Sequence, residues 1–184
     1  MTATSDPYAA VMPSAADLVT ALARPILDFP KPGIRFLDIT PVLADGPALA
    51  AVAAALVEPF AGKFDVVAGT EARGFAFAAA AAVHAGTGLL LIRKAGKLPG
   101  EHISESYALE YGEATLEVHT GQLAPGTRVL LVDDVLATGG TLSASARLIE
   151  RAGWVVAGIS VVLEITFLEG RAALAREVST ITTD

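Results

Sequence analysis

The residues best suited to chemistry stand together in VLLVDDVLATGGT, residues 129–141. A run of apolar residues leads there into two acids and then into a turn that consists of Ala137, Thr138, Gly139, Gly140 and Thr141. The two glycines permit backbone conformations that are closed to other residues, so the N–H groups of the turn can face an anion at a helix N-terminus. The pattern predicts a phosphate-binding loop. It is not a Walker A loop, since no lysine follows the glycines, and it is not a GxGxxG fingerprint.

Asp133 and Asp134 immediately precede this loop. Two carboxylates repel a phosphate placed directly on them, so they must bind a group beside it. Carboxylates accept hydrogen bonds from vicinal sugar hydroxyls and can hold Mg²⁺ through water. A ribose 5-phosphate satisfies both halves of the motif. Either half alone is more typical of a solvated turn, whereas the complete string favours a binding site.

Basic residues follow two other apolar segments. VVAGTEARGF, residues 66–75, contains Arg73, and LLLIRKAGKLPG, residues 89–100, contains Arg93, Lys94 and Lys97. Taken singly, each is more often a solvated loop charge. If both segments are strands of one parallel sheet, however, the four cations lie at the same edge as the phosphate loop. Arginine suits charge-assisted contacts with phosphate oxygens, so this grouping indicates a second anionic group such as pyrophosphate.

ESYALEYGEATLEVH, residues 105–119, alternates around Gly112 and predicts a hairpin. Glu110 and Tyr111 stand next to its turn. A glutamate at a strand tip is usually only solvated. On a lid over a sugar site, however, its carboxyl group can transfer a proton to or from a base while the closed loop keeps water from an oxocarbenium-like sugar.

The elements that position these residues are expected to alternate along the chain. We predict helices from a Ser14 N-cap to about residue 27 and over about 47–60, from about 75, and over 141–152, with a turn at 28–33. We predict strands over 64–68, 89–92, 128–132 and 154–163. Short apolar strands that alternate with helices indicate an α/β fold with a mainly parallel sheet, which binds ligands at the carboxyl ends of its strands.

Composition excludes several classes of protein. The 184 residues are 53% hydrophobic and 18% charged, which fits one folded domain. A net charge of −7 argues against a general nucleic-acid binder, and the lack of cysteine excludes disulfides and thiolate chemistry. The N-terminus lacks the pattern of a signal peptide, so we expect a cytoplasmic protein. Residues 74–92 carry no Asp, Glu, Lys or Arg, but His84 and the glycines near residue 87 favour a buried helix and a strand over a membrane span.

The phosphate-loop string resembles the motif that binds phosphoribosyl pyrophosphate (PRPP) in type I phosphoribosyltransferases. GTEARGF, IRKAGKLPGE, SYALEYG and FPKPGIRFLDIT resemble successive signatures of the adenine phosphoribosyltransferase branch, in order over about residues 28–171. The resemblance implies the type I fold, with a mainly parallel five-stranded sheet, flanking helices, an N-terminal hood over about 28–40 and a mobile loop and hairpin over about 94–119. The whole chain, residues 1–184, is expected to form this single domain, with residues 1–13 flexible.

The resemblance also implies an activity: adenine and PRPP give AMP and pyrophosphate in purine salvage, with Mg²⁺ bound to PRPP, in a homodimer that binds neither nucleic acid nor membrane. It assigns the 5-phosphate to residues 137–141 and the ribose hydroxyls, near Mg²⁺, to Asp133 and Asp134. It assigns pyrophosphate to Glu71, Ala72, Arg73, Arg93, Lys94 and Lys97, and acid/base catalysis to Glu110. It assigns the base pocket to Ile34, Arg35, Phe36, Tyr111 and Ile165.

The chain departs from this family at one point. Members usually read FRD or FKD where this chain has Phe36, Leu37 and Asp38, so a base-pocket cation is missing, while Arg35 replaces an aliphatic residue. Arg35 stands two positions before Leu37, so it cannot simply substitute for the lost cation without a local rearrangement. This departure concerns base selectivity and leaves PRPP binding untouched. Two alternatives stay open: a phosphoribosyltransferase for another purine, such as hypoxanthine or xanthine, and a PRPP-sensing regulator without activity.

Overall fold

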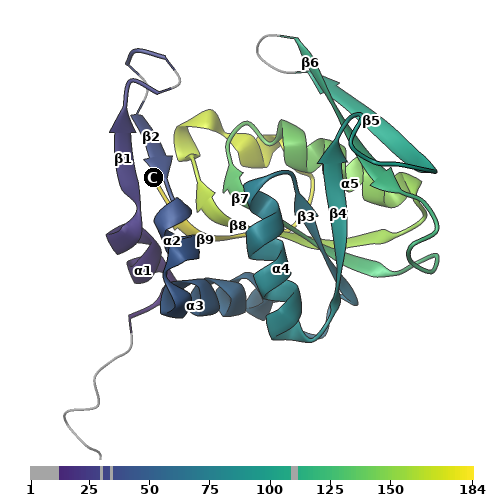
Figure 1. Cartoon of the computed structure of the whole chain (residues 1–184), viewed down its shortest axis with the longest axis horizontal. Coiled ribbons are helices and arrows are strands. Elements are labelled where there is room, and N and C mark those ends of the chain that lie inside the picture. Colours follow the sequence, from purple (N-terminus) through teal and green to yellow (C-terminus); the bar gives the residue numbers. More distant parts are fainter. Residues whose placement is uncertain (1–12, 30, 34, 109–111) are drawn as a thin grey trace, which may run out of the picture.

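The computed structural model describes residues 13–29, 31–33, 35–108 and 112–184. Within that part of the chain, seven strands form one sheet in the order β5-β6-β4-β3-β7-β8-β9, and β1 and β2 form a separate antiparallel pair (Figure 1). The strands are β1 Arg24–Leu27, β2 Arg35–Asp38, β3 Val66–Thr70, β4 Gly88–Lys94, β5 His102–Ala108, β6 Glu113–His119, β7 Arg128–Leu136, β8 Val155–Glu164 and β9 Val178–Thr183. The helices are α1 Ala15–Leu22, α2 Thr40–Ala44, α3 Gly46–Val57, α4 Arg73–Ala85 and α5 Gly140–Arg151, with short 3-10 turns at Glu58–Phe60, Thr166–Leu168 and Gly170–Ala173.

Five of the seven strands, β4, β3, β7, β8 and β9, are parallel, which confirms the predicted α/β class. The hairpin is also confirmed: β5 pairs antiparallel with β6, and β6 continues the sheet by pairing antiparallel with β4. The strand β7 lies inside the sheet between β3 and β8 and is apolar on both faces until it reaches its acids, as a doubly covered strand requires. The carboxyl ends of β3, β4 and β7 therefore meet at one edge.

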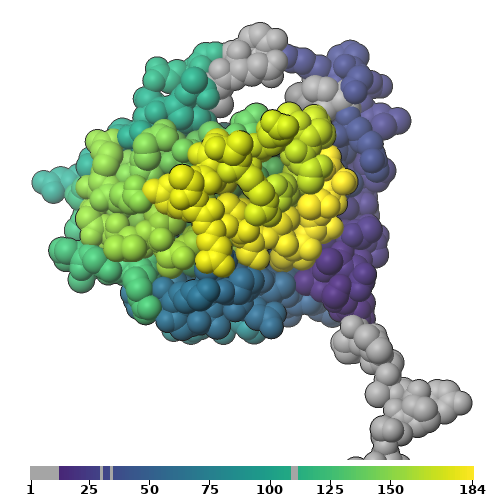
Figure 2. All heavy atoms as spheres, turned by 180° about the vertical axis from the view of Figure 1, so that it is seen from behind, coloured from purple at the N-terminus to yellow at the C-terminus, as the bar shows by residue number. Residues whose placement is uncertain are grey.

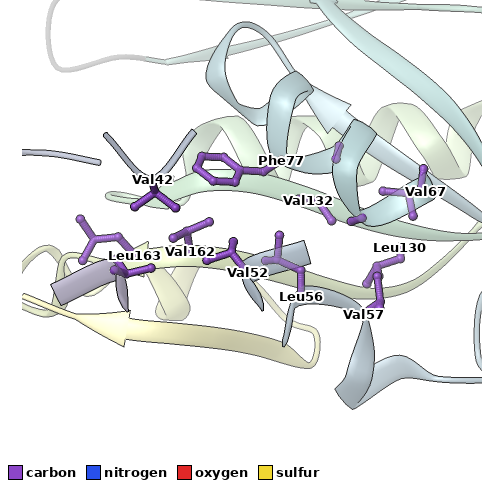
Figure 3. Packing of buried hydrophobic residues seen from close by; sticks show 14 of the residues in the cluster. Val42, Val52, Leu56, Val57, Val67, Phe77, Leu130, Val132, Val162 and Leu163 are labelled. Carbon is purple, nitrogen blue, oxygen red and sulfur yellow. The ribbon is translucent and has the colours of Figure 1, made fainter. Parts of the chain in front are cut away.

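Helices cover both faces of the sheet. On one face, α3 and α4 pack their apolar residues against β7 and β8, as the close view of Leu56, Phe77, Val132 and Val162 shows (Figure 3). On the other face, Leu148 of α5 belongs to a second buried cluster with residues of β3, β4, β6 and β7. Because every central strand is held from both sides, the loops at the carboxyl edge start from rigid supports.

The first helix begins where the sequence predicts and ends earlier. The Ser14 hydroxyl accepts a hydrogen bond from the Asp17 N–H at 3.1 Å, and the Asp17 carboxylate accepts one from the Ser14 N–H at 3.0 Å, which completes a capping box. The prediction that the helix reaches residue 27 is wrong, because α1 ends at Leu22 and residues 24–27 form β1. Pro25 explains the difference, since proline disfavours helical backbone at the residue before it.

The uncharged stretch over residues 74–92 contains most of α4, which ends at the left-handed Gly86, and the first part of β4. This agrees with the predicted buried helix and strand. Across the described ranges, no helix is both long and apolar enough to cross a membrane.

Candidate functional site

The loop 137–141 links the end of β7 to the first turn of α5, at the carboxyl edge of the sheet. Gly139 has a left-handed backbone with φ of 80°, and a Cβ atom on it would lie 2.5 Å from the carbonyl oxygen of Gly170. Both the backbone conformation and the close contact therefore require glycine. The strand, loop and helix follow one another as the motif predicts, and the N-terminus of α5 opens at the loop.

The adjacent acids of β7 occupy different environments. Asp133 is buried: a Cβ atom on Gly74, in the first turn of α4, would lie 2.6 Å from its Oδ1 atom. Burial, and then the charge of Asp134, raise the pKa of Asp133 to about 8. Asp134 is more accessible, and its Oδ2 atom accepts a hydrogen bond from the Arg73 Nε atom at 2.5 Å. Asp133 is thus a buried acid beneath the site, and Asp134 is the acid that pairs with the Arg73 side chain.

Glu71, directly after β3, gathers the cations of β4. Its carboxylate accepts hydrogen bonds from Lys97 Nζ at 2.6 Å, from Arg93 Nε at 3.3 Å and from the backbone N–H of Lys94 at 3.1 Å. The side chain of Glu71 is only 8% exposed, and the Lys97 hydrogen bond is the main cause that lowers its pKa. The peptide bond to Ala72 is cis.

The four cations predicted for this edge are therefore brought there by the ends of two neighbouring strands, β3 and β4. Arg73, Arg93 and Lys97 are each paired with a carboxylate, and these pairings were not predicted from the sequence. Because Glu71 and Asp134 both accept from cationic groups, the two acids preorganise the positive side chains around the same edge of the sheet. The arrangement offers positive charge and backbone N–H groups to one ligand with two anionic ends.

The β1–β2 pair stands beside these residues. The ring of Phe36 lies 5.5 Å from the guanidinium carbon of Arg73 and meets the Phe29 ring edge to face at 5.2 Å. Leu37 points the other way and packs against the core cluster of α3 and α4. The position where the resemblance leads us to expect a cation thus holds a half-buried leucine that packs on the core.

The side chain of Arg35 is on the opposite face of β2 from that of Phe36. Hydrogen bonds from Thr166 are the main cause that lowers the pKa of Asp184, and the charge of Arg35 lowers it further. Thr166 directly follows Ile165, which is half-buried at the end of β8 and donates its N–H to the Leu136 carbonyl at 2.9 Å. Arg35 therefore lies near enough to Asp184, which accepts a hydrogen bond from the Thr166 N–H, for their charges to interact.

Three predicted site residues, Ile34, Glu110 and Tyr111, lie outside the described residues. The described parts of the hairpin and of the β1–β2 pair rise on either side of a hollow above the C-terminal segments, drawn in yellow and yellow-green (Figure 2).

Other residues that build the site were not predicted. A Cβ atom on Gly170 would lie 2.0 Å from the Ala137 carbonyl oxygen, so the turn at 170–173 presses directly on the phosphate loop. The Arg171 guanidinium holds this turn by donating to both carboxylate oxygens of the buried Glu164, at 2.7 to 2.9 Å. Only the Gly-Arg pair after a strand end hints at this support in the sequence.

The site does not form a metal-binding cage by itself. In the described ranges, no group of three or more His, Asp or Glu side chains is placed to hold a metal ion. Two adjacent carboxylates remain, which is the donor set that suits a Mg²⁺ ion carried by a substrate's own oxygens.

Comparison with known proteins places this geometry in context. The sequence profile of the phosphoribosyl transferase domain matches residues 41–178. An adenine phosphoribosyltransferase of Clavibacter michiganensis subsp. michiganensis is 66% identical over 161 residues, which cover 88% of this chain and 91% of the relative.

Solved structures of adenine phosphoribosyltransferases have the same fold as this chain. The adenine phosphoribosyltransferase of Thermoanaerobacter pseudethanolicus superposes with a TM-score of 0.87 at 44% identity, covering 92% of this chain and 99% of the other. The enzyme of Saccharomyces cerevisiae, solved with adenine and an imino-altritol bisphosphate, gives a TM-score of 0.86 at 34% identity, covering 91% and 98%.

Proposed function

The chain belongs to the phosphoribosyl transferase family, among the adenine phosphoribosyltransferases, and on this premise we propose that its site converts adenine and PRPP into AMP and pyrophosphate. One observation carries the proposal: a glycine-rich loop at a helix N-terminus, a pair of acids and a set of preorganised cations meet at one edge of the sheet. PRPP presents a matching set of groups, namely a 5-phosphate, two ribose hydroxyls and a pyrophosphate.

Binding would use these parts in parallel. The N–H groups and hydroxyls of loop 137–141 bind the 5-phosphate, and the side-chain oxygens of Asp133 and Asp134 form hydrogen bonds with the ribose hydroxyls. Arg73, Arg93, Lys94 and Lys97 bind the pyrophosphate, together with the backbone at Ala72. The charge of Glu71 would repel the pyrophosphate, so Glu71 does not bind it directly. It contributes by holding the side chains of Arg93 and Lys97 in place.

Transfer breaks the bond between the ribose C1 atom and a pyrophosphate oxygen and forms a bond from C1 to a ring nitrogen of adenine. The pyrophosphate leaves with the electron pair, so cations that are already in place stabilise the charge that develops on it. The base loses a proton in the same reaction. We assign the acid/base role at the purine N7 side to Glu110, which the family pattern places beside Tyr111.

Mg²⁺ fits this site as an ion that arrives on PRPP. It would lie near Asp133 and Asp134 and would neutralise pyrophosphate oxygens. Asp134 is the more accessible of the two carboxylates.

The base pocket would be formed by Ile34, Phe36, Tyr111 and Ile165, with Arg35 at its border. The S. cerevisiae relative was solved with adenine, which supports adenine as the acceptor. The position of the Phe36 ring beside Arg73 supports a base pocket next to the pyrophosphate end of the site.

We further propose a cytoplasmic homodimer. The groove between α3 and α4 supports this, because it is lined by small apolar residues and bordered by Val83, which is 82% exposed. Val83→Lys should yield monomers in light scattering. Val155→Lys, at an apolar residue of β8 that is 50% exposed, is the control and should remain dimeric. A monomeric wild-type protein would contradict the dimer.

The activity is tested by following both products. Protein incubated with PRPP, Mg²⁺ and adenine should release one pyrophosphate for each AMP formed. Pyrophosphate release without AMP would show hydrolysis of PRPP, and no reaction with any purine would favour a PRPP-sensing regulator.

A further inference from the structure

The strand β5 lies with one face on α5, the helix that begins at the phosphate loop. Its residues alternate in burial: Ile103, Glu105 and Tyr107 are half-buried, and the residues between them are exposed. Tyr107 packs against the cluster that contains Leu148 of α5. The hairpin is therefore attached to the same helix that presents the loop.

Tyr107 reaches the loop itself. Its hydroxyl oxygen lies 3.1 Å from the Oγ1 atom of Thr141, and its ring passes over Gly140, where a Cβ atom would lie 3.2 Å from the ring. Glycine at position 140 thus leaves room for the tyrosine to approach the last hydroxyl of the loop.

A second contact fixes β5 on α5 without this hydroxyl pair. The Glu105 carboxylate accepts from Arg147 Nε at 2.5 Å and from an Arg151 terminal nitrogen at 2.6 Å. Arg151 also donates to the backbone carbonyl of Ser104 at 2.7 Å. The arginines stand four residues apart on one face of α5. Removing the Tyr107 hydroxyl should therefore leave the strand in place.

We propose that Tyr107 is a positioning residue for phosphate binding, an inference that rests on the proposed function of loop 137–141. The Thr141 hydroxyl has one proton to donate. When Tyr107 donates its own proton to Thr141 Oγ1, the Thr141 proton is free to point at an anion in the loop. Hydrogen bonds in such a chain strengthen one another, and the bond to a charged phosphate is the stronger type.

The test measures ribose 5-phosphate binding by calorimetry. Tyr107→Phe removes the hydroxyl and keeps the ring on Gly140. A net hydrogen bond is worth about 0.5 to 1.5 kcal/mol, so affinity should fall about 2- to 12-fold. The matched control is Ser106→Ala on the opposite face of β5, which loses a hydroxyl pair with Thr115 at 2.8 Å and should bind as wild type does.

Two further measurements make the result specific. In a Thr141→Val background, Tyr107→Phe should have no additional effect, because its partner is gone. In the enzyme assay, Tyr107→Phe should raise the KM for PRPP and leave that for adenine unchanged.

The outcomes separate the two claims. If wild-type protein does not bind ribose 5-phosphate, the proposed phosphate loop is wrong. If wild type binds and Tyr107→Phe binds equally well, or if Ser106→Ala weakens binding as much, the role of Tyr107 is wrong.

Discussion

Arg73, the first residue of α4, donates a hydrogen bond from Nε to the Oδ2 atom of Asp134 on β7 at 2.5 Å. A residue predicted to bind pyrophosphate is therefore hydrogen-bonded to a residue predicted to bind the ribose. The contact joins two elements 61 positions apart in sequence. It keeps the guanidinium in place beside Phe36. We expect the acid to serve twice, as an acceptor for a ribose hydroxyl and as an anchor for Arg73.

Asp134→Asn should accordingly weaken PRPP binding. The amide keeps the shape of the side chain but loses the charge that holds Arg73, and hydrogen bonds to charged groups are worth about 1.5 to 3 kcal/mol. Calorimetry with PRPP and Mg²⁺ should show a loss of about tenfold or more. Equal affinity would contradict the double role.

Glu71→Gln should weaken binding of the pyrophosphate end of PRPP and leave binding of the 5-phosphate end unchanged. Without the carboxylate, Arg93 and Lys97 must be ordered by the ligand, at about 0.5 to 1.5 kcal/mol for each side chain. The KM for PRPP should rise several-fold. The affinity for ribose 5-phosphate, which lacks pyrophosphate, should not change. Tighter PRPP binding by the variant would mean that Glu71 competes with the ligand.

Asp133→Asn should stabilise the fold in a pH-dependent way. The pKa of Asp133 is raised to about 8 in the folded protein, against an ordinary value of 3.8. Between these values the folded state binds a proton that the unfolded chain has released, so stability falls as pH rises toward 8. Asparagine does not ionise, so the variant should melt above wild type, by more at pH 8 than at pH 5.

The control for this prediction is Asp65→Asn, since the Arg128 hydrogen bond holds the pKa of Asp65 at about 2. That residue stays ionised throughout the range, so its effect on melting should be the same at pH 5 and pH 8. A gap for Asp133→Asn that is constant with pH would show that the buried carboxyl is not the cause.

Gly170→Ala should disturb the phosphate loop from outside. The added methyl group would lie 2.0 Å from the Ala137 carbonyl, and such overpacking typically costs about 1 to 3 kcal/mol. We expect a lower melting temperature and weaker binding of ribose 5-phosphate. Gly46→Ala, which meets no atom within 4 Å, is the control and should change neither. Full phosphate affinity in Gly170→Ala would show that the 170–173 turn does not support the loop.

Much of the fold follows from local pattern. The apolar run of β7 and the alternation around Gly112 each predict their element, because burial on two faces or on one face leaves a direct trace in the sequence. The strand β9 was not predicted. Its sequence VSTITT is polar and half-buried, so its place beside β8 depends on a partner distant in sequence.

In the site, too, features set by local sequence could be predicted and features set by distant contacts could not. The loop 137–141 and the cations after β3 and β4 could be predicted, since glycine and charge at strand ends have local meanings. The pairing of Glu71 with Lys97 and of Arg73 with Asp134 could not, because each depends on which strands are neighbours in the sheet. Leu37 is informative for the same reason: only the packing shows that it belongs to the core.

The central claim is transfer of a phosphoribosyl group to adenine, and competition between bases tests it most directly. Protein given PRPP, Mg²⁺ and equal concentrations of adenine, hypoxanthine and xanthine should form AMP almost alone, and Glu110→Gln should slow this by about tenfold or more. A product mixture dominated by another nucleotide, or no nucleotide at all, would contradict the account.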